Sequence, residues 1–269
     1  MQYQQLIQHI FHKQSYLCVG LDTDLQKLPP HLLHDENPIL TFNKKIIDAT
    51  RSVCVAYKIN TAFYEIHGSA GWETMRATIA YIGNEHLIIV DAKRGDIGNT
   101  STMYAKAIFE NLQADAITVS PYMGKDSVQP FLAFADKWTI LLALTSNIGS
   151  EDFQQQPLAN GDTLFKQVIK TSLTWGSHEQ IMYVVGATHP QALKTIRELV
   201  PHHFLLIPGV GVQGGDVAAV SAAAWTANVG LLINSSRQII YADNGKKFDA
   251  AAARQATILQ QQMKNFINR

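Results

Sequence analysis

Two carboxylates and one ammonium group are concentrated in residues 91–100, directly after the apolar run 87–90. Asp91 and Lys93 are two positions apart, so on a β-strand both side chains point to the same face. Asp96 follows three residues later, where Gly95 and Gly98 allow the chain to fold back over the strand end. Charges gathered in this way are costly unless they pair with one another or act on a substrate. The segment therefore indicates a functional site at the C-terminal edge of a strand.

Short apolar runs that predict strands alternate with longer segments of helical period. Strands are predicted at 16–22, 55–60, 87–93, 116–120, 139–145, 181–186, 204–208 and 230–234. Helices are predicted near 37–53, 69–82, 100–113, 126–137, 162–175, 190–199, 214–225 and 247–267, and the first 14 residues predict one more. This alternation is typical of a parallel sheet with right-handed crossovers. Eight units in about 250 residues match a closed (β/α)₈ TIM barrel, with the extra helix at its N-terminus.

No linker, composition shift or low-complexity block divides the chain, so we expect a single barrel domain over 1–269. A doubly wound open sheet is the competing fold, but it predicts a glycine-rich dinucleotide turn after the first strand. The sequence Gly-Leu-Asp-Thr-Asp at 20–24 is not such a turn. The longest irregular stretch, 146–161, follows the fifth strand and is typical of an active-site cover or a surface excursion.

The overall charge gives no reason to expect nucleic-acid or membrane-surface binding, because 22 basic side chains balance 22 acidic ones. Cys18 and Cys54 lie in apolar segments, and we expect both to be reduced core thiols. The first residues lack the features of a signal peptide, and no apolar stretch reaches the roughly 18–20 residues that span a bilayer. We therefore expect a cytoplasmic protein without membrane contact.

Polar residues fall at the same end of most of the predicted strands, which is where barrel enzymes carry their chemistry. They are Asp22 on the first strand, Lys58 on the second, Thr145 and Ser146 at the fifth, and Ser236 and Arg237 after the eighth. Each one alone is more often a solvated charge at the rim. Their coincidence is what indicates an active site. The ten histidines show neither HxH nor HExxH spacing, so no metal site is expected.

The loops after the seventh and eighth strands have the composition of a phosphate site. Four glycines in 209–215 leave backbone N–H groups uncovered by side chains. Gln213 adds a neutral donor and Arg237 a cation that can bind an anion through two hydrogen bonds. Phosphate sites of barrel enzymes are commonly built from these two loops.

Together these motifs closely resemble the orotidine 5′-phosphate decarboxylase family, over nearly the whole chain. The family signature Asp-x-Lys-x-x-Asp is present as Asp91, Lys93 and Asp96, although related barrel enzymes acting on sugar phosphates share it. The stretches 57–65, Tyr-Lys-Ile-Asn-Thr-Ala-Phe-Tyr-Glu, and 234–237, Asn-Ser-Ser-Arg, are similar to the longer-chain bacterial branch. Ile59 and Ile148 stand where that branch often has proline, and neither touches the expected chemistry.

The resemblance implies conversion of orotidine 5′-phosphate to uridine 5′-phosphate, the last step of pyrimidine nucleotide synthesis, in a homodimer without metal or cofactor. Lys93 would stabilise and protonate the C6 carbanion, which is a physically reasonable role for a fixed ammonium. The remaining implied roles are Asp91 and Asp96 flanking Lys93, Lys58 holding Asp91 and a ribose hydroxyl, Asp22 on the ribose, Ser146 or Thr145 on the pyrimidine, and Gln213, Gly211, Gly214, Ser236 and Arg237 on the phosphate. By the same analogy Asp96, Ile97 and Thr100 would reach the partner subunit's site.

Three alternatives remain open at this point. A metal-assisted decarboxylase of keto-sugar phosphates would need a further carboxylate near Asp91 to complete a Mg²⁺ site. A pentose-phosphate epimerase would need histidines at strand ends. A catalytically silent phosphate-binding barrel is disfavoured because Lys58, Asp91, Lys93 and Asp96 are all present.

Overall fold

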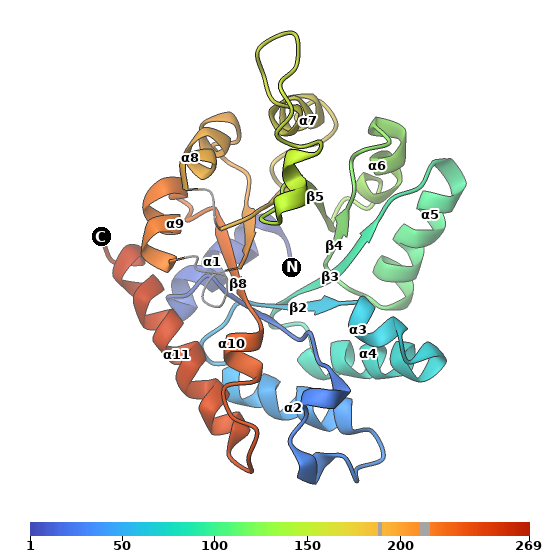
Figure 1. Ribbon diagram of the computed structural model, residues 1–269, viewed down its shortest axis with the longest axis vertical. Coiled ribbons are helices and arrows are strands. Elements are labelled where there is room, and N and C mark those ends of the chain that lie inside the picture. Colours follow the sequence, from blue (N-terminus) through green and yellow to red (C-terminus); the bar gives the residue numbers. More distant parts are fainter. Residues whose placement is uncertain (188–189, 210–215) are drawn as a thin grey trace.

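Eight parallel strands close into a barrel, with helices around it (Figure 1). The computed structural model describes residues 1–187, 190–209 and 216–269. Each strand pairs with the next in the chain, and β1 also pairs with β8, where Cys18 is opposite Asn234. The strands are β1 Leu17–Gly20, β2 Ala56–Asn60, β3 Leu87–Arg94, β4 Ala116–Val119, β5 Trp138–Leu144, β6 Ile181–Val185, β7 Leu205–Pro208 and β8 Leu231–Ser235. The predicted TIM barrel is confirmed.

The helices follow the strands in the predicted alternation. They are α1 Tyr3–Lys13, α2 Pro38–Thr50, α3 Ala62–Glu65, α4 Gly68–Ile82, α5 Gly98–Lys106, α6 Lys125–Leu132, α7 Leu164–Ser172, α8 Pro190–Leu199, α9 Val217–Ala224, α10 Arg237–Ile240 and α11 Phe248–Ile267. Most strand residues are buried, because the barrel interior covers one face of the sheet and the helices cover the other. Cys18 and Cys54 are buried free thiols of this core.

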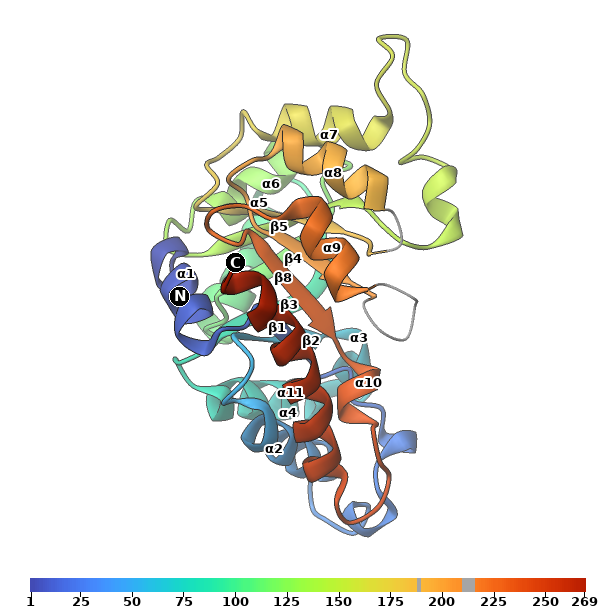
Figure 2. The same ribbon diagram turned by 90° about the vertical axis from the view of Figure 1, so that its left-hand side faces the viewer.

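Several boundaries differ from the sequence predictions, and two of the differences affect the site. The first strand ends at Gly20, so Asp22 lies in the following loop rather than on the strand. After β8 the chain forms the short helix α10, which begins at Arg237 and was not predicted. The irregular stretch after β5 contains a 3₁₀ helix at Ile148–Glu151, and its continuation projects away from the barrel (Figures 1 and 2).

The N-terminal helix α1 covers the end of the barrel opposite to α3 and α10 (Figure 2). Its residues Leu6 and Ile10 are fully buried, and the Trp138 indole N–H donates to the carbonyl of Met1 over 2.8 Å. This end is therefore closed, which leaves the C-terminal ends of the strands as the open face. Among the helices of the described residues, none combines the length and apolarity needed to span a bilayer.

A buried arginine, Arg197, joins the C-terminal ends of α8 and α9 to the N-terminal end of the barrel. The Arg197 guanidinium donates to the carbonyl oxygens of Val200, His203, Ala224 and Gly230 at 2.7–2.8 Å. Val200 and Ala224 lie at the C-termini of α8 and α9, where the helix dipoles favour a cation. No carboxylate of the described residues pairs with it, and burial lowers the pKa of Arg197 to about 10.

Replacing Arg197 should destabilise the protein without touching the open face. In Arg197→Met, four buried carbonyl groups lose the hydrogen bond from the guanidinium, and we expect the free energy of unfolding to fall by at least about 3 kcal/mol. Urea denaturation measures this change. Arg76→Met is the control, since Arg76 is half exposed and its partners, Glu73 of its own helix and Asn111 Oδ1 at 3.1 Å, are both exposed. A loss below about 0.5 kcal/mol in Arg197→Met would contradict the structural role.

Candidate active site

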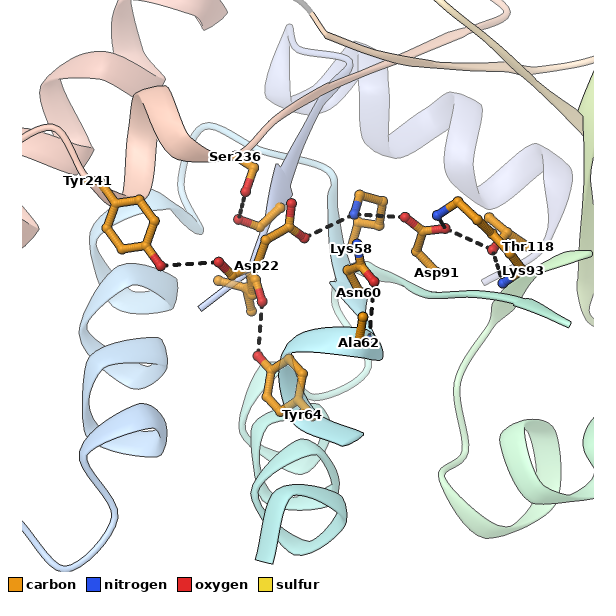
Figure 3. A network of polar contacts seen from close by, with 12 residues as sticks. Asp22, Lys58, Asn60, Ala62, Tyr64, Asp91, Lys93, Thr118, Ser236 and Tyr241 are labelled. Atoms are coloured by element: carbon orange, nitrogen blue, oxygen red, sulfur yellow. Dashed lines mark hydrogen bonds and ion pairs between the residues drawn. The ribbon is translucent and has the colours of Figure 1, made fainter. Parts of the chain in front are cut away.

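A buried ammonium group lies between two carboxylates at the open end of the barrel (Figure 3). Lys58 on β2 places its Nζ 3.1 Å from Oδ1 of Asp22 and 3.1 Å from Oδ2 of Asp91. Its side chain is only 4% exposed. Burial lowers the pKa of Lys58, but the two carboxylates outweigh burial and hold that pKa above its ordinary value. Lys58 is therefore a permanent cation that joins the ends of three neighbouring strands.

Asp91 continues this network to Lys93, whose Nζ lies 2.6 Å from Oδ1 of Asp91. Thr118 on β4 links the same two residues: its hydroxyl donates to Asp91 Oδ1 over 2.8 Å and accepts the backbone N–H of Lys93 over 2.9 Å. Asp22, Lys58, Asp91 and Lys93 thus form a row of alternating charge. Lys93 is the member that reaches solvent, with 49% of its side chain exposed.

The strand carrying Asp91 and Lys93 is irregular at this point. Val90 pairs with Ile117 and Arg94 with Val119, so the pairing of β3 with β4 is shifted between them. Lys93 has φ 46°, in the left-handed region that is unfavourable for residues other than glycine. The Thr118 hydroxyl supplies a partner for the Lys93 N–H where the regular ladder is interrupted. The ion pair of Asp91 with Lys93 therefore lies at an irregular point of β3.

Burial alone raises the pKa of Asp91, but the ammonium groups of Lys58 and Lys93 and the hydrogen bonds from Lys93 and Thr118 outweigh it. Together they lower that pKa from 3.8 to about 2. The carboxylate therefore stays ionised at any pH at which such an enzyme works.

A cavity of about 210 Å³ opens beside the charged row. Asp22, Lys58 and Asp91 form one side of it, and Ser236 and Arg237 lie on its wall after β8. Its remaining lining residues are Asn60, Pro208, Gly209, Asn234, Ser235 and Gln238. The cavity therefore extends from Asp22, Lys58 and Asp91 of the charged row to the proposed anion site at Arg237. Gly211, Gln213 and Gly214 lie outside the described residues.

Close packing fixes two of the loops at the open end of the barrel. A Cβ on Gly20, at the end of β1, would stand 2.7 Å from the Cβ of Ser236. A Cβ on Gly186, after β6, would stand 2.8 Å from the Cβ of Ser146. Glycine at these two positions lets the loops after β8 and β5 approach the barrel rim.

Two groups of predicted residues stand apart from the charged row. Asp96 accepts a hydrogen bond from the N–H of Ile97 over 2.8 Å, and no ion pair joins Asp96 to Lys93 within the described chain. Ile97 and Thr100 are exposed. Thr145 uses its hydroxyl within its own loop, on Asn147 over 2.6 Å, whereas no side-chain hydrogen bond of Ser146 is found in the part of the chain that the structure describes.

Sequence reasoning assigned no role to three residues of the site. Thr118 has the period-two spacing of an inward-facing strand position, but threonine is common in strands. Asn60 lies two residues after Lys58 on the same face of β2 and lines the cavity. Asn234 is 6% exposed, and its Oδ1 has no hydrogen-bond partner among the described residues. The inward alternation of β2, β4 and β8 is the signal that marks all three.

No group of three or more His, Cys, Asp or Glu side chains is arranged to hold a metal ion within residues 1–187, 190–209 and 216–269. The two carboxylates at the cavity, Asp22 and Asp91, are instead paired with the ammonium of Lys58.

A closed barrel with a charged row and an arginine-bearing cavity at its C-terminal face is typical of a TIM-barrel enzyme. A sequence model of the "Orotidine 5'-phosphate decarboxylase / HUMPS family" matches residues 15–254, and the chain belongs to this family. The expected family membership is confirmed.

Relatives and solved structures agree with this assignment. The chain is 57% identical over 262 residues to orotidine 5′-phosphate decarboxylase of Porphyromonas gingivalis, covering 96% of this chain and 95% of that one. It is 54% identical over 266 residues to the Bacteroides fragilis enzyme of the same name, covering 98% and 97% of the two chains. The structure of Leishmania donovani OMP decarboxylase is similar with TM-score 0.84 and 32% identity, covering 100% of both chains.

The charged row predicts a measurable titration. The folded-state pKa of Asp91 lies below the ordinary value of 3.8, so its ionisation stabilises the fold above that value and the contribution disappears as the pH falls through about 2. The ¹³C resonance of the Asp91 carboxyl should therefore show no titration above about pH 3. In Lys58→Met the midpoint should rise by about one unit or more, because one of two nearby cations is gone. An unchanged midpoint would show that Lys58 does not control Asp91.

Proposed function

We propose that the protein decarboxylates orotidine 5′-phosphate to uridine 5′-phosphate, the last step of pyrimidine nucleotide synthesis, with Lys93 as the catalytic cation and proton donor. The observation that carries this proposal is the row of alternating charge, Asp22–Lys58–Asp91–Lys93, which ends in a solvent-reaching ammonium at the open end of the barrel. The family match and relatives that are themselves named orotidine 5′-phosphate decarboxylase support the same reaction. A role in nucleotide synthesis also fits the cytoplasmic location expected from the sequence.

The chemistry requires charge stabilisation at one carbon. Loss of CO₂ from C6 of the pyrimidine leaves an electron pair on a ring carbon with little resonance stabilisation. In the proposed pose Lys93 Nζ lies beside C6, where its positive charge stabilises the developing carbanion. One N–H proton then moves to C6, the electron pair forms the new C–H bond, and Lys93 is left neutral until solvent reprotonates it.

Asp91 keeps this ammonium in place and charged. Its pKa of about 2 means that it presents a negative charge to Lys93 throughout catalysis. Lys58 supports it from the other side and is held by Asp22 in turn. These ion pairs hold Lys93 in a defined position, so little reorganisation is needed when the carbanion develops.

The cavity accommodates the remainder of the substrate in this proposal. Asp22 and Lys58 face the ribose, and Arg237 and Ser236 face the phosphate together with Gln213, Gly211 and Gly214. Ser146 is the better candidate for the pyrimidine amide, because the Thr145 hydroxyl is occupied by Asn147 and Gln154.

We further propose a homodimer in which Asp96, Ile97 and Thr100 complete the partner's site. Asp96 forms no ion pair with Lys93 of its own chain among the described residues. Its neighbour Ile97 exposes 57% of its surface, and Met123, 45% exposed, lies close to Gly95. Exposed apolar side chains around a carboxylate fit a contact between subunits.

The alternatives fit the site less well. A metal-assisted sugar-phosphate decarboxylase needs a further carboxylate near Asp91, but the acids at the cavity wall, Asp22 and Asp91, are both paired with Lys58. An epimerase needs histidines at the strand ends, and no histidine is among the described residues lining the cavity. A catalytically silent barrel would have no use for the costly charged row of Asp22, Lys58, Asp91 and Lys93.

Replacing Lys93 with alanine should abolish turnover and leave the fold intact. The charge at C6 and the proton donor disappear together, so we expect activity to fall at least about 10⁴-fold. The assay follows loss of orotidine 5′-phosphate absorbance, and turnover by the wild-type protein should persist in EDTA.

Lys170→Ala is the matched control for this experiment, because Lys170 pairs with Asp162 over the same 2.6 Å as Lys93 with Asp91 but lies on α7. It should retain wild-type activity. Lys93→Ala activity within tenfold of wild type would refute the assignment, and turnover that EDTA abolishes would favour the metal-assisted alternative.

A mixture of two inactive variants tests the shared site. In a heterodimer of Lys93→Ala and Asp96→Ala, one site carries both changes and the other carries neither. Random exchange of subunits should therefore restore up to about a quarter of wild-type activity per site.

Each variant alone is the control and should stay inactive, and native mass spectrometry verifies that heterodimers form. If heterodimers form and no activity returns, Asp96 acts in the site of its own chain.

A further inference from the structure

Three consecutive backbone carbonyls at the end of β1 each accept a hydrogen bond from a hydroxyl group (Figure 3). Ser236 Oγ donates to Gly20 O over 3.0 Å, Tyr64 OH donates to Leu21 O over 3.0 Å, and Tyr241 OH donates to Asp22 O over 3.1 Å. We call these three residues the hydroxyl clamp. The clamp holds the backbone of residues 20–22, and the carboxylate of Asp22 in turn pairs with Lys58.

The hydroxyls reach this segment from two directions. Tyr64 lies on α3, and Ser236 and Tyr241 lie immediately before and after α10. α10 begins with Arg237, which faces the proposed phosphate position. The clamp therefore attaches the loop of Asp22 to the same helical turn that carries Arg237.

Of the two hydroxyl residues that flank α10, Tyr241 makes more contacts than Ser236. Besides donating to Asp22 O, its hydroxyl accepts the backbone N–H of Asp24 over 2.7 Å, so it spans the loop on both sides of Thr23. Its ring stacks on Phe42 with centroids 6.0 Å apart, and the Lys27 ammonium lies 5.7 Å from the ring centroid. Because both its ring and its hydroxyl are held, Tyr241 cannot rotate freely, and a shift of α10 would also shift the loop of Asp22.

A continuous series of short contacts runs from Arg237 to Lys93. The N–H of Tyr241 donates to the carbonyl of Arg237 over 3.1 Å, which closes the α10 turn. The Tyr241 hydroxyl then holds Asp22, the Asp22 carboxylate holds Lys58, and Lys58 holds Asp91 and through it Lys93. Each step is a hydrogen bond or ion pair of normal length.

We propose that Tyr241 is a positioning residue that couples phosphate binding at Arg237 to the alignment of the charged row. This inference rests on the proposed function, because it assumes that Arg237 binds the substrate phosphate. A phosphate drawn to Arg237 fixes the α10 turn, and Tyr241 then fixes the backbone that carries Asp22. Binding energy from a group remote from C6 thereby contributes to the geometry at C6.

The test is a double-mutant cycle with Tyr241→Phe and Arg237→Ala. Tyr241→Phe keeps the stacked ring and removes only the hydroxyl, and kcat/KM should fall about tenfold or more. Arg237→Ala should then cost at least about threefold less in the Tyr241→Phe background than in the wild-type protein, because part of its effect has already been lost.

Two other tyrosines provide matched controls. Tyr64→Phe removes a hydroxyl from the same loop but from the α3 side, so it should lower kcat/KM and remain additive with Arg237→Ala. Tyr183→Phe removes a buried hydroxyl that contacts Ser172 over 2.8 Å, far from the loop, and should change neither activity nor the effect of Arg237→Ala. Equal coupling in Tyr64→Phe would reduce Tyr241 to a purely structural role.

The outcomes separate this inference from the proposed function. If wild-type protein turns over the substrate and Lys93→Ala does not, but Tyr241→Phe is unimpaired or additive with Arg237→Ala, the coupling is wrong and the function stands. If wild-type protein has no activity, the function fails first. Circular dichroism checks folding, and if Tyr241→Phe does not fold, Tyr241→Leu removes the same hydroxyl and must show the coupling.

Discussion

The ion pairs of Lys58 with Asp22 and Asp91 are the interaction on which the site depends. An ammonium with 4% exposure is tolerable only if carboxylates compensate for its lost hydration. Both distances are 3.1 Å, so the ends of three strands must converge on one nitrogen atom. The backbone is irregular at both carboxylates. β1 ends at Gly20, so Asp22 lies in a loop, and β3 departs from regular pairing where it carries Asp91.

This arrangement also explains how a lysine can be both charged and accessible. Lys58 is buried and structural, and it holds Asp91 ionised, so that Asp91 can hold a second ammonium at the edge of solvent. Lys93 is half exposed and is restrained through its backbone as well as its side chain, since Thr118 binds its N–H. The left-handed backbone at Lys93 costs of order 1 kcal/mol or more, and the surrounding contacts supply it.

Much of the fold and of the charged row could be predicted from the sequence, because both depend on local patterns. Apolar runs of strand length alternate with helical segments, and the acids and lysines stand where those runs end. The hydroxyl contacts that support the charged row could not be predicted in this way. Tyr64 and Tyr241 look like core aromatics in a sequence, and only the folded chain shows their hydroxyls on the carbonyls of Leu21 and Asp22.

The irregularity of β3 could not be read from composition either, because residues 91–94 fit a regular strand equally well. It depends on the position of β4, which is set by contacts distant in sequence. A buried arginine such as Arg197 is similarly unexpected, since arginine is almost always exposed or paired with an acid. Its partners are carbonyl groups, which every residue has and which therefore leave no trace in a sequence.

Arg197 separates the residues that stabilise α8 and α9 from the residues that form the site at the other end of the barrel. Helices of ten and eight residues such as α8 and α9 are marginal by themselves, and both end on this one guanidinium together with the approaches to β7 and β8. Loss of this one side chain would therefore weaken both helix ends and both strand approaches together. Arg197 lies at the closed end. The loop after β8 lies at the other end of the barrel, so substitutions there leave the bonds of Arg197 to the helix ends intact.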